Sequence, residues 1–147
     1  MSIPASLFAR LADSAVVSGL CGGRIYPVFA PAGSESSGPF VVYSLADSAR
    51  DSHTKGSSGL VTYSYKVEAV ADSYELATSL AGAVLDVVES WRDKSGDSDI
   101  RFISVSGEED DFDRLGDGSD KALYIRRMTL GVTVRERRTA IPSGSAE

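Results

Sequence analysis

Residues 60–91, LVTYSYKVEAVADSYELATSLAGAVLDVVESW, contain the change of pattern that decides the fold. Over residues 60–71 apolar and polar side chains alternate, which is typical of a strand with one buried face. From residue 72 onward the apolar spacing becomes helical and stays so to the end of the stretch. A one-sided strand followed directly by an amphipathic helix predicts a sheet whose apolar face is covered by that helix.

The predicted helix opens on residues 72–75, DSYE. Asp72 is expected to cap the free N–H groups of the first turn, while Glu75 reaches back in capping-box spacing. The apolar stripe that follows is interpreted as core, and it consists of Leu76, Leu80, Val84, Val87, Val88 and Trp91.

Shorter patterns on either side complete the predicted fold. Residues 4–20 predict a helix with a break near 13–14, and Pro27 indicates that the extended segment 25–29 is at an edge or very brief. Strands are expected at 40–46, 100–105 and 123–135. The last strand should direct its even positions to the core and its odd ones to solvent or a partner, the two sets being Met128, Leu130, Val132 and Val134, and Arg127, Thr129, Thr133 and Arg135.

This order predicts an α+β fold, with an antiparallel β-sheet that includes a long hairpin and with helices packed on one face. A single domain is expected over residues 1–138, followed by a flexible C-terminal tail at 139–147. The segment 47–59 is polar and too long for a simple hairpin connection. It is predicted to be a projecting hairpin tip that contacts a partner, with the candidate contact residues Arg50, Asp51, His53 and Lys55.

Charge is distributed unevenly along a chain whose net charge is −6. Residues 108–120 hold seven acids and one base, whereas residues 121–147 hold six bases and two acids. One interpretation is a solvated acidic loop followed by a strand with exposed arginines. Another is a pair of complementary patches that meet between copies, and pairing within one fold stays open. The candidate subunit-interface residues are Asp110, Asp111, Arg126, Arg127 and Arg135.

The composition offers little for catalysis or metal binding. Cys21 and His53 are the single cysteine and the single histidine, so neither an internal disulfide nor a structural zinc site can form. Residues 117–120, DGSD, look like part of a calcium loop but lack its length and terminal Glu. We expect no enzymatic activity, no cofactor and no metal. The acidic balance also argues against a dedicated nucleic-acid binder, and no apolar run is long enough for a membrane partner to be expected.

Several stretches, taken in order, resemble one protein family. They are GGRIYP at 22–27, GPFVVY at 38–43, YKVEAVA at 65–71, SYELA at 73–77 and LYIRRMTL at 123–130. In this order and spacing they resemble the tail completion, or tail terminator, proteins of long-tailed bacteriophages, over about residues 3–138. Ala71-Asp72 departs from the small or aromatic pair that usually precedes the family's helix.

The resemblance implies a structural virion protein that forms a ring, usually a hexamer, at the head-proximal end of the tail. Such a ring would end the tail tube and join it to the head-side connector. The implied partners are further copies of the chain, the tail tube protein and the head-completion or connector protein, with DNA only passing through the lumen. The protein would reside in the host cytoplasm during assembly. Related proteins also occur in gene-transfer particles. The alternatives are an acidic, monomeric adaptor or immunity-type binding protein, and a small enzyme.

Overall fold

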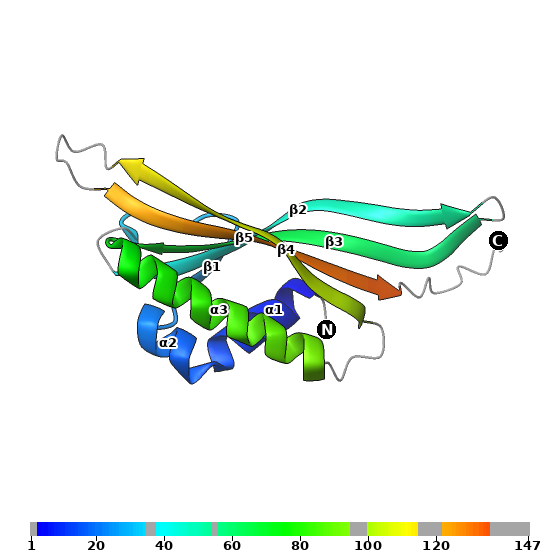
Figure 1. The fold of residues 1–147 in the computed structure, drawn as a ribbon, viewed down its shortest axis with the longest axis horizontal. Coiled ribbons are helices and arrows are strands. Elements are labelled where there is room, and N and C mark those ends of the chain that lie inside the picture. The colour runs from blue at the N-terminus through cyan, green and yellow to red at the C-terminus, as the bar shows by residue number, and fades with distance from the viewer. Residues whose placement is uncertain (1–2, 35–37, 54–55, 95–99, 115–121, 136–147) are drawn as a thin grey trace.

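The computed structural model describes residues 3–34, 38–53, 56–94, 100–114 and 122–135. Within these residues the chain forms three helices and five strands (Figure 1). The helices are α1 (Ile3–Asp13), α2 (Ala15–Cys21) and α3 (Tyr74–Lys94). The strands are β1 (Ile25–Pro27), β2 (Phe40–His53), β3 (Gly56–Ala71), β4 (Ile100–Arg114) and β5 (Ala122–Arg135).

The strands form one sheet in the order β1-β2-β3-β5-β4, and the helices lie together on one side of it (Figure 1). This confirms the predicted α+β class, the β2–β3 hairpin and the one-sided helical layer. The sheet is mixed, however, because β1 pairs with β2 in parallel while every other pairing is antiparallel. Pro27 ends β1 at the sheet edge, as its missing N–H predicts.

The core lies between the sheet and α3. The alternating side chains of β3 point into it as predicted, with Val61, Tyr65 and Val67 at most 5% exposed. Leu80 and Val84 of α3 are fully buried against them. Val88 and Trp91 at the end of the stripe are also buried, whereas Leu76 at its start is exposed and Val87 is only partly covered. The even positions of β5 are also core, which confirms the prediction for Met128, Leu130, Val132 and Val134.

The helix ends follow local capping chemistry. Ser14 breaks the first helical segment where predicted, because its side chain accepts the N–H of Val17 and starts α2. Gly22 ends α2 in the left-handed conformation that glycine tolerates. The cap of α3 is Ser73, whose hydroxyl accepts the N–H of Leu76 at 3.2 Å. The prediction that Asp72 caps this helix is therefore wrong by one residue.

Two segments predicted as loops are strands. The predicted tip 47–59 is largely β2 and β3, which stay paired until His53 meets Gly56. The acidic stretch forms β4 as far as Arg114, in register with β5. Aspartate, glutamate and glycine have low strand propensity, so pairing with the neighbouring strand accounts for these extensions. Figure 1 shows the resulting β2–β3 arm reaching well past the helices.

The sheet face opposite the helices carries a small apolar cluster, in which Phe40, Val42 and Val70 are buried. The predicted tail 139–147, and with it the domain boundary at 138, lies outside the described residues and stays a prediction. In the part of the chain that the structure describes, no single helix is long and apolar enough to cross a membrane. Only α1 and α2 taken together, bent by 81°, reach the required length and composition.

Candidate functional site

Arg126 and Arg127, which are consecutive in β5, each contact a group of acidic side chains, and the two groups lie on opposite faces of the sheet. Arg127 lies in register with Glu68 of β3, whose side chain points away from the helices. Arg126 is one residue earlier, so its side chain points to the helix side. The pairing of β4 with β5 sets Glu109 opposite Arg127 and Asp110 opposite Arg126. Each arginine is thereby placed between acids from neighbouring elements.

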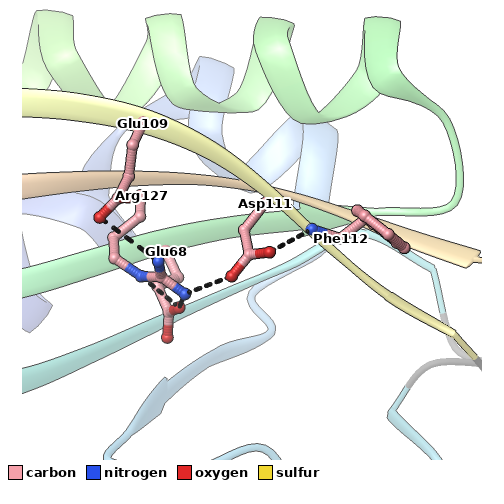
Figure 2. Close-up of polar contacts among 5 residues, drawn as sticks. All are labelled: Glu68, Glu109, Asp111, Phe112 and Arg127. Carbon is pink, nitrogen blue, oxygen red and sulfur yellow. Dashed lines mark hydrogen bonds and ion pairs between the residues drawn. The ribbon is translucent and has the colours of Figure 1, made fainter.

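Figure 2 shows the Arg127 cluster on the face opposite the helices. The guanidinium lies 2.8 Å from Glu68, 3.2 Å from Asp111 and 3.4 Å from Glu109, each measured from N to O. The Phe112 N–H and the Arg127 guanidinium donate hydrogen bonds to Asp111 and lower the pKa of that carboxyl. Burial opposes the charge of Arg127, but the hydrogen bonds with Glu68, Asp111 and Glu109 prevail and raise its pKa.

The Arg126 cluster on the helix side includes an aromatic residue. Arg126 donates to Asp110 through Nε and lies 3.5 Å from Glu108. The hydroxyl of Tyr74, in the first turn of α3, donates to Asp110 at 2.8 Å and accepts from Arg126 at 3.2 Å. The Tyr74 and Arg126 hydrogen bonds both lower the pKa of Asp110, and the Asp110 hydrogen bond raises that of Arg126. The cluster therefore ties the start of α3 to β4 and β5.

The two clusters leave this end of the sheet negative. Five carboxylates, from Glu68, Glu108, Glu109, Asp110 and Asp111, surround two guanidinium groups. Three negative charges thus stay uncompensated within the clusters. The structure pairs Asp110 with Arg126 and Asp111 with Arg127 within one subunit, which is one of the alternatives that the sequence left open. A role of the same residues in contacting neighbours stays a prediction.

The remaining predicted site residues lie at the other end of the sheet. Arg135 is exposed at the end of β5 and is in register with Leu60, far from the acidic clusters. Arg50 is exposed on β2, in register with Val61. Asp51 and His53 belong to β2, and Lys55 lies outside the described residues. The structure therefore places Arg50 and Arg135 at the same end of the sheet, apart from Asp110 and Asp111.

Sequence reasoning missed the aromatic residues beside the acidic end. Tyr74 and Tyr124 make an edge-to-face contact with ring centroids 6.2 Å apart. Phe112 is in register with Tyr124 and is 58% exposed. The available signal was Phe112 itself, which is an aromatic residue within a run of acids. The register that brings it to Tyr124 and Tyr74 has no local signature.

No constellation for catalysis emerges from the described residues. Cys21 is a free thiol buried in the core, which makes it a packing residue. Among the described residues there is no group of three or more His, Cys, Asp and Glu side chains placed to hold a metal ion, and residues 117–120 lie outside them. An open groove of about 610 Å³ lies between the α1–α2 break and α3. It is lined by Arg10, Asp13, Ser14, Val16, Ala83, Asp86, Val87 and Ser90, which include no nucleophile paired with a base.

Comparison with known proteins finds a matching family model and solved structures of similar fold. The family model described as tail completion protein gp17 matches residues 5–129. A solved chain from the virion of a native gene transfer agent particle has the same fold, with a TM-score of 0.67 and 17% sequence identity. The alignment covers 92% of this chain and 96% of that one. No curated protein sequence matches.

Proposed function

This chain belongs to the tail completion protein gp17 family, and we propose that it closes a hexameric ring at the head-proximal end of a phage-like tail. It is a structural protein of the virion tail. In the proposed role the ring ends polymerisation of the tail tube and provides the surface on which the head-side connector docks. The lumen would let DNA pass, and the ring itself would carry out no chemistry.

The observation that carries this proposal is the asymmetry of the sheet. A ring built by head-to-tail contacts needs two unlike surfaces on every copy. One end of this sheet carries the surplus carboxylates around Arg126 and Arg127. The other end of β4 and β5 carries the exposed arginines Arg101 and Arg135. Ends of opposite charge favour a contact between the acidic end of one copy and the basic end of the next.

The β2–β3 arm supports contact with a second kind of partner. Beyond Leu45, itself 52% exposed, residues 46–50 of β2 are exposed as well, so this half of β2 contributes little to the core. Past Arg50 and Leu60 the pairing of β3 with β5 has ended, and β2 and β3 continue without it. A two-stranded ribbon is marginal by itself and is stabilised when it packs on another surface. The arm is proposed to lie against the tail tube protein or the connector when the ring is in place.

The proposed function is tested by deleting the gene and examining particles by electron microscopy. Without the protein we expect separate heads and tails, and tubes of variable length. Restoring the wild-type chain should restore joined particles of uniform tail length. Native mass spectrometry of the purified protein, alone and with tube protein, should detect a six-copy assembly.

Two outcomes would contradict the proposal. Normal particles in the deletion strain would remove the chain from tail completion. A protein that stays monomeric with tube protein, and is missing from purified particles, would instead favour the acidic adaptor or immunity-type alternative. Both measurements are needed because a ring that forms only on the tube would escape detection in the isolated protein.

A further inference from the structure

Three exposed aromatic side chains lie on the helix side of the sheet, at the acidic end that holds the clusters around Arg126 and Arg127. We name them the aromatic surface. It consists of Tyr74, Phe112 and Tyr124, which are 48%, 58% and 37% exposed. Exposed aromatic groups gathered at one place are typical of a binding surface, and tyrosine is common among residues that dominate binding energy. The rings come from three elements, α3, β4 and β5, so the surface exists only in the folded chain.

The aromatic surface is held rigid by its own contacts. Tyr74 is fixed by hydrogen bonds with Asp110 and Arg126, and the Arg126 guanidinium also lies 6.0 Å from the centre of its ring. Tyr124 packs edge-to-face on Tyr74. A preorganised surface loses little conformational entropy when a partner binds. Arg126 therefore acts within the subunit, as a support for Tyr74.

The surroundings of the aromatic surface select the charge of its partner. Asp72 and Glu75 flank Tyr74 in the chain and are both exposed, as is Glu108 beside Arg126. Apart from Arg126, these neighbours are acidic. A partner that presents a basic group next to an apolar one would match this surface in both respects.

Such a surface is present on the same chain at the opposite end of the sheet, and we name it the basic corner. Phe102 of β4 is 59% exposed and lies in register with Thr133 of β5. Arg135 is two residues beyond Thr133 on the same face, and Arg101 precedes Phe102 and is exposed. Thr133 contacts Thr62 on the face that points away from the helices. The basic corner and the aromatic surface therefore lie at opposite ends and on opposite faces of the sheet.

We propose that the aromatic surface of one copy binds the basic corner of a second copy, and this rests on the ring of the proposed function. Because the two surfaces lie on opposite faces and at opposite ends of the sheet, neighbouring copies overlap at their ends. The helix side of one copy, at its acidic end, covers the other face of the next copy at its basic end. Phe102 packs on Phe112 and Tyr124, while Arg101 and Arg135 meet the acidic neighbours of the aromatic surface, which are Asp72, Glu75 and Glu108. The contact is heterologous, so every copy uses both surfaces once and the ring can close.

The experiment uses the full-length protein in three variants. Phe112→Lys removes an exposed ring of the aromatic surface and adds a charge that repels the basic corner. Arg101→Glu with Arg135→Glu reverses the basic corner. Phe29→Lys is the matched control, because Phe29 is an exposed aromatic residue in the turn after β1, at the opposite edge of the sheet from β4 and outside both surfaces. Circular dichroism melting shows whether each variant is folded, and native mass spectrometry measures assembly, alone and with tube protein.

We expect both surface variants to be folded monomers, with the contact weakened by at least about tenfold, the effect of losing one dominant interface residue. The control should assemble as the wild type does. An equal mixture of the two surface variants retains one intact pair of surfaces and should give heterodimers and nothing larger.

Rings formed by either surface variant, or a mixture that stays monomeric, would overturn this contact while leaving the ring proposal intact. A wild-type chain that forms no ring even on the tube would overturn both. If Phe112→Lys melts well below the control, Phe112→Ser replaces it, with the same expected heterodimer.

Discussion

The two halves of β2 differ more than any other neighbouring parts of the molecule. Phe40, Val41, Val42 and Tyr43 are all at most 7% exposed, whereas every residue from Leu45 to Arg50 is exposed. Both halves pair with β3 in the same antiparallel ladder. The difference is that the first half has helices on one face and an apolar cluster on the other. Strand pairing thus extends well beyond the core, and folding stability should concentrate in the covered half.

The largest expected effect follows from removing apolar volume in the covered half. Leu80 of α3 is fully buried, so Leu80→Ala should lower the free energy of unfolding by about 2–5 kcal/mol. Leu45→Ala, in the uncovered half, should change it by no more than about 0.5 kcal/mol. Urea denaturation of both variants measures the contrast. Equal losses would mean that the arm belongs to the cooperative core and that the comparison is wrong.

A smaller effect is expected from the ion cluster on the face opposite the helices. Arg127→Met keeps the aliphatic part of the side chain but leaves Glu68, Glu109 and Asp111 without their cation. Because all four side chains retain contact with water, the loss should be about 1 kcal/mol. Arg135→Met, at the exposed end of the same strand, is the matched control and should be close to neutral. A neutral Arg127→Met would mean that solvent alone compensates these carboxylates.

The acid clusters also predict how stability depends on pH. The pKa values of Asp110 and Asp111 lie below their ordinary value of 3.8 in the folded chain. The stabilisation they provide is therefore complete above that value and is lost as the pH falls through the lowered pKa values. The difference in melting temperature between the wild type and Asp111→Asn should be constant from pH 7 to about pH 5 and then shrink in acid. A difference that grows in acid would contradict this sign.

The residues that sequence reasoning placed correctly are those whose environment is set by near neighbours in the chain. The alternation in β3 and β5, the helical spacing in α3 and the break at Ser14 all have local causes. The parallel pairing of β1 with β2 has no local cause in the sequence, because it joins two segments that are not adjacent in the chain. A solvated loop is one interpretation of the acidic run in the sequence, whereas the structure has residues 108–114 in β4. As an edge strand β4 exposes these carboxylates to water, which also discourages pairing with other chains.

In the candidate site, too, some features follow from the local sequence and others depend on contacts between distant elements. Charge counting identified Asp110, Asp111, Arg126 and Arg127 as residues that could meet between copies or within one fold, and the structure has them paired within one subunit. Which acid meets which arginine is set by the register of β4 on β5, including the irregularity between Val105 and Gly107. Tyr74 joins Asp110 only because α3 begins beside the end of the sheet. Such placements depend on contacts between elements distant in sequence, so composition and spacing cannot supply them.

The smallest expected effect on folding comes from shortening the arm, and it sharpens the comparison most. Arg50 is in register with Val61, so replacing residues 51–60 by Asn-Gly gives a two-residue hairpin loop closed by that pair. Val61, which is 2% exposed and part of the core, stays in place. The free energy of unfolding should therefore change by no more than about 1 kcal/mol.

If the arm binds the tube protein or the connector, the shortened chain should still form rings yet fail to join tails to heads. Electron microscopy of particles made with this variant measures the joined fraction, and a fraction equal to the wild type's would leave the arm without the proposed partner.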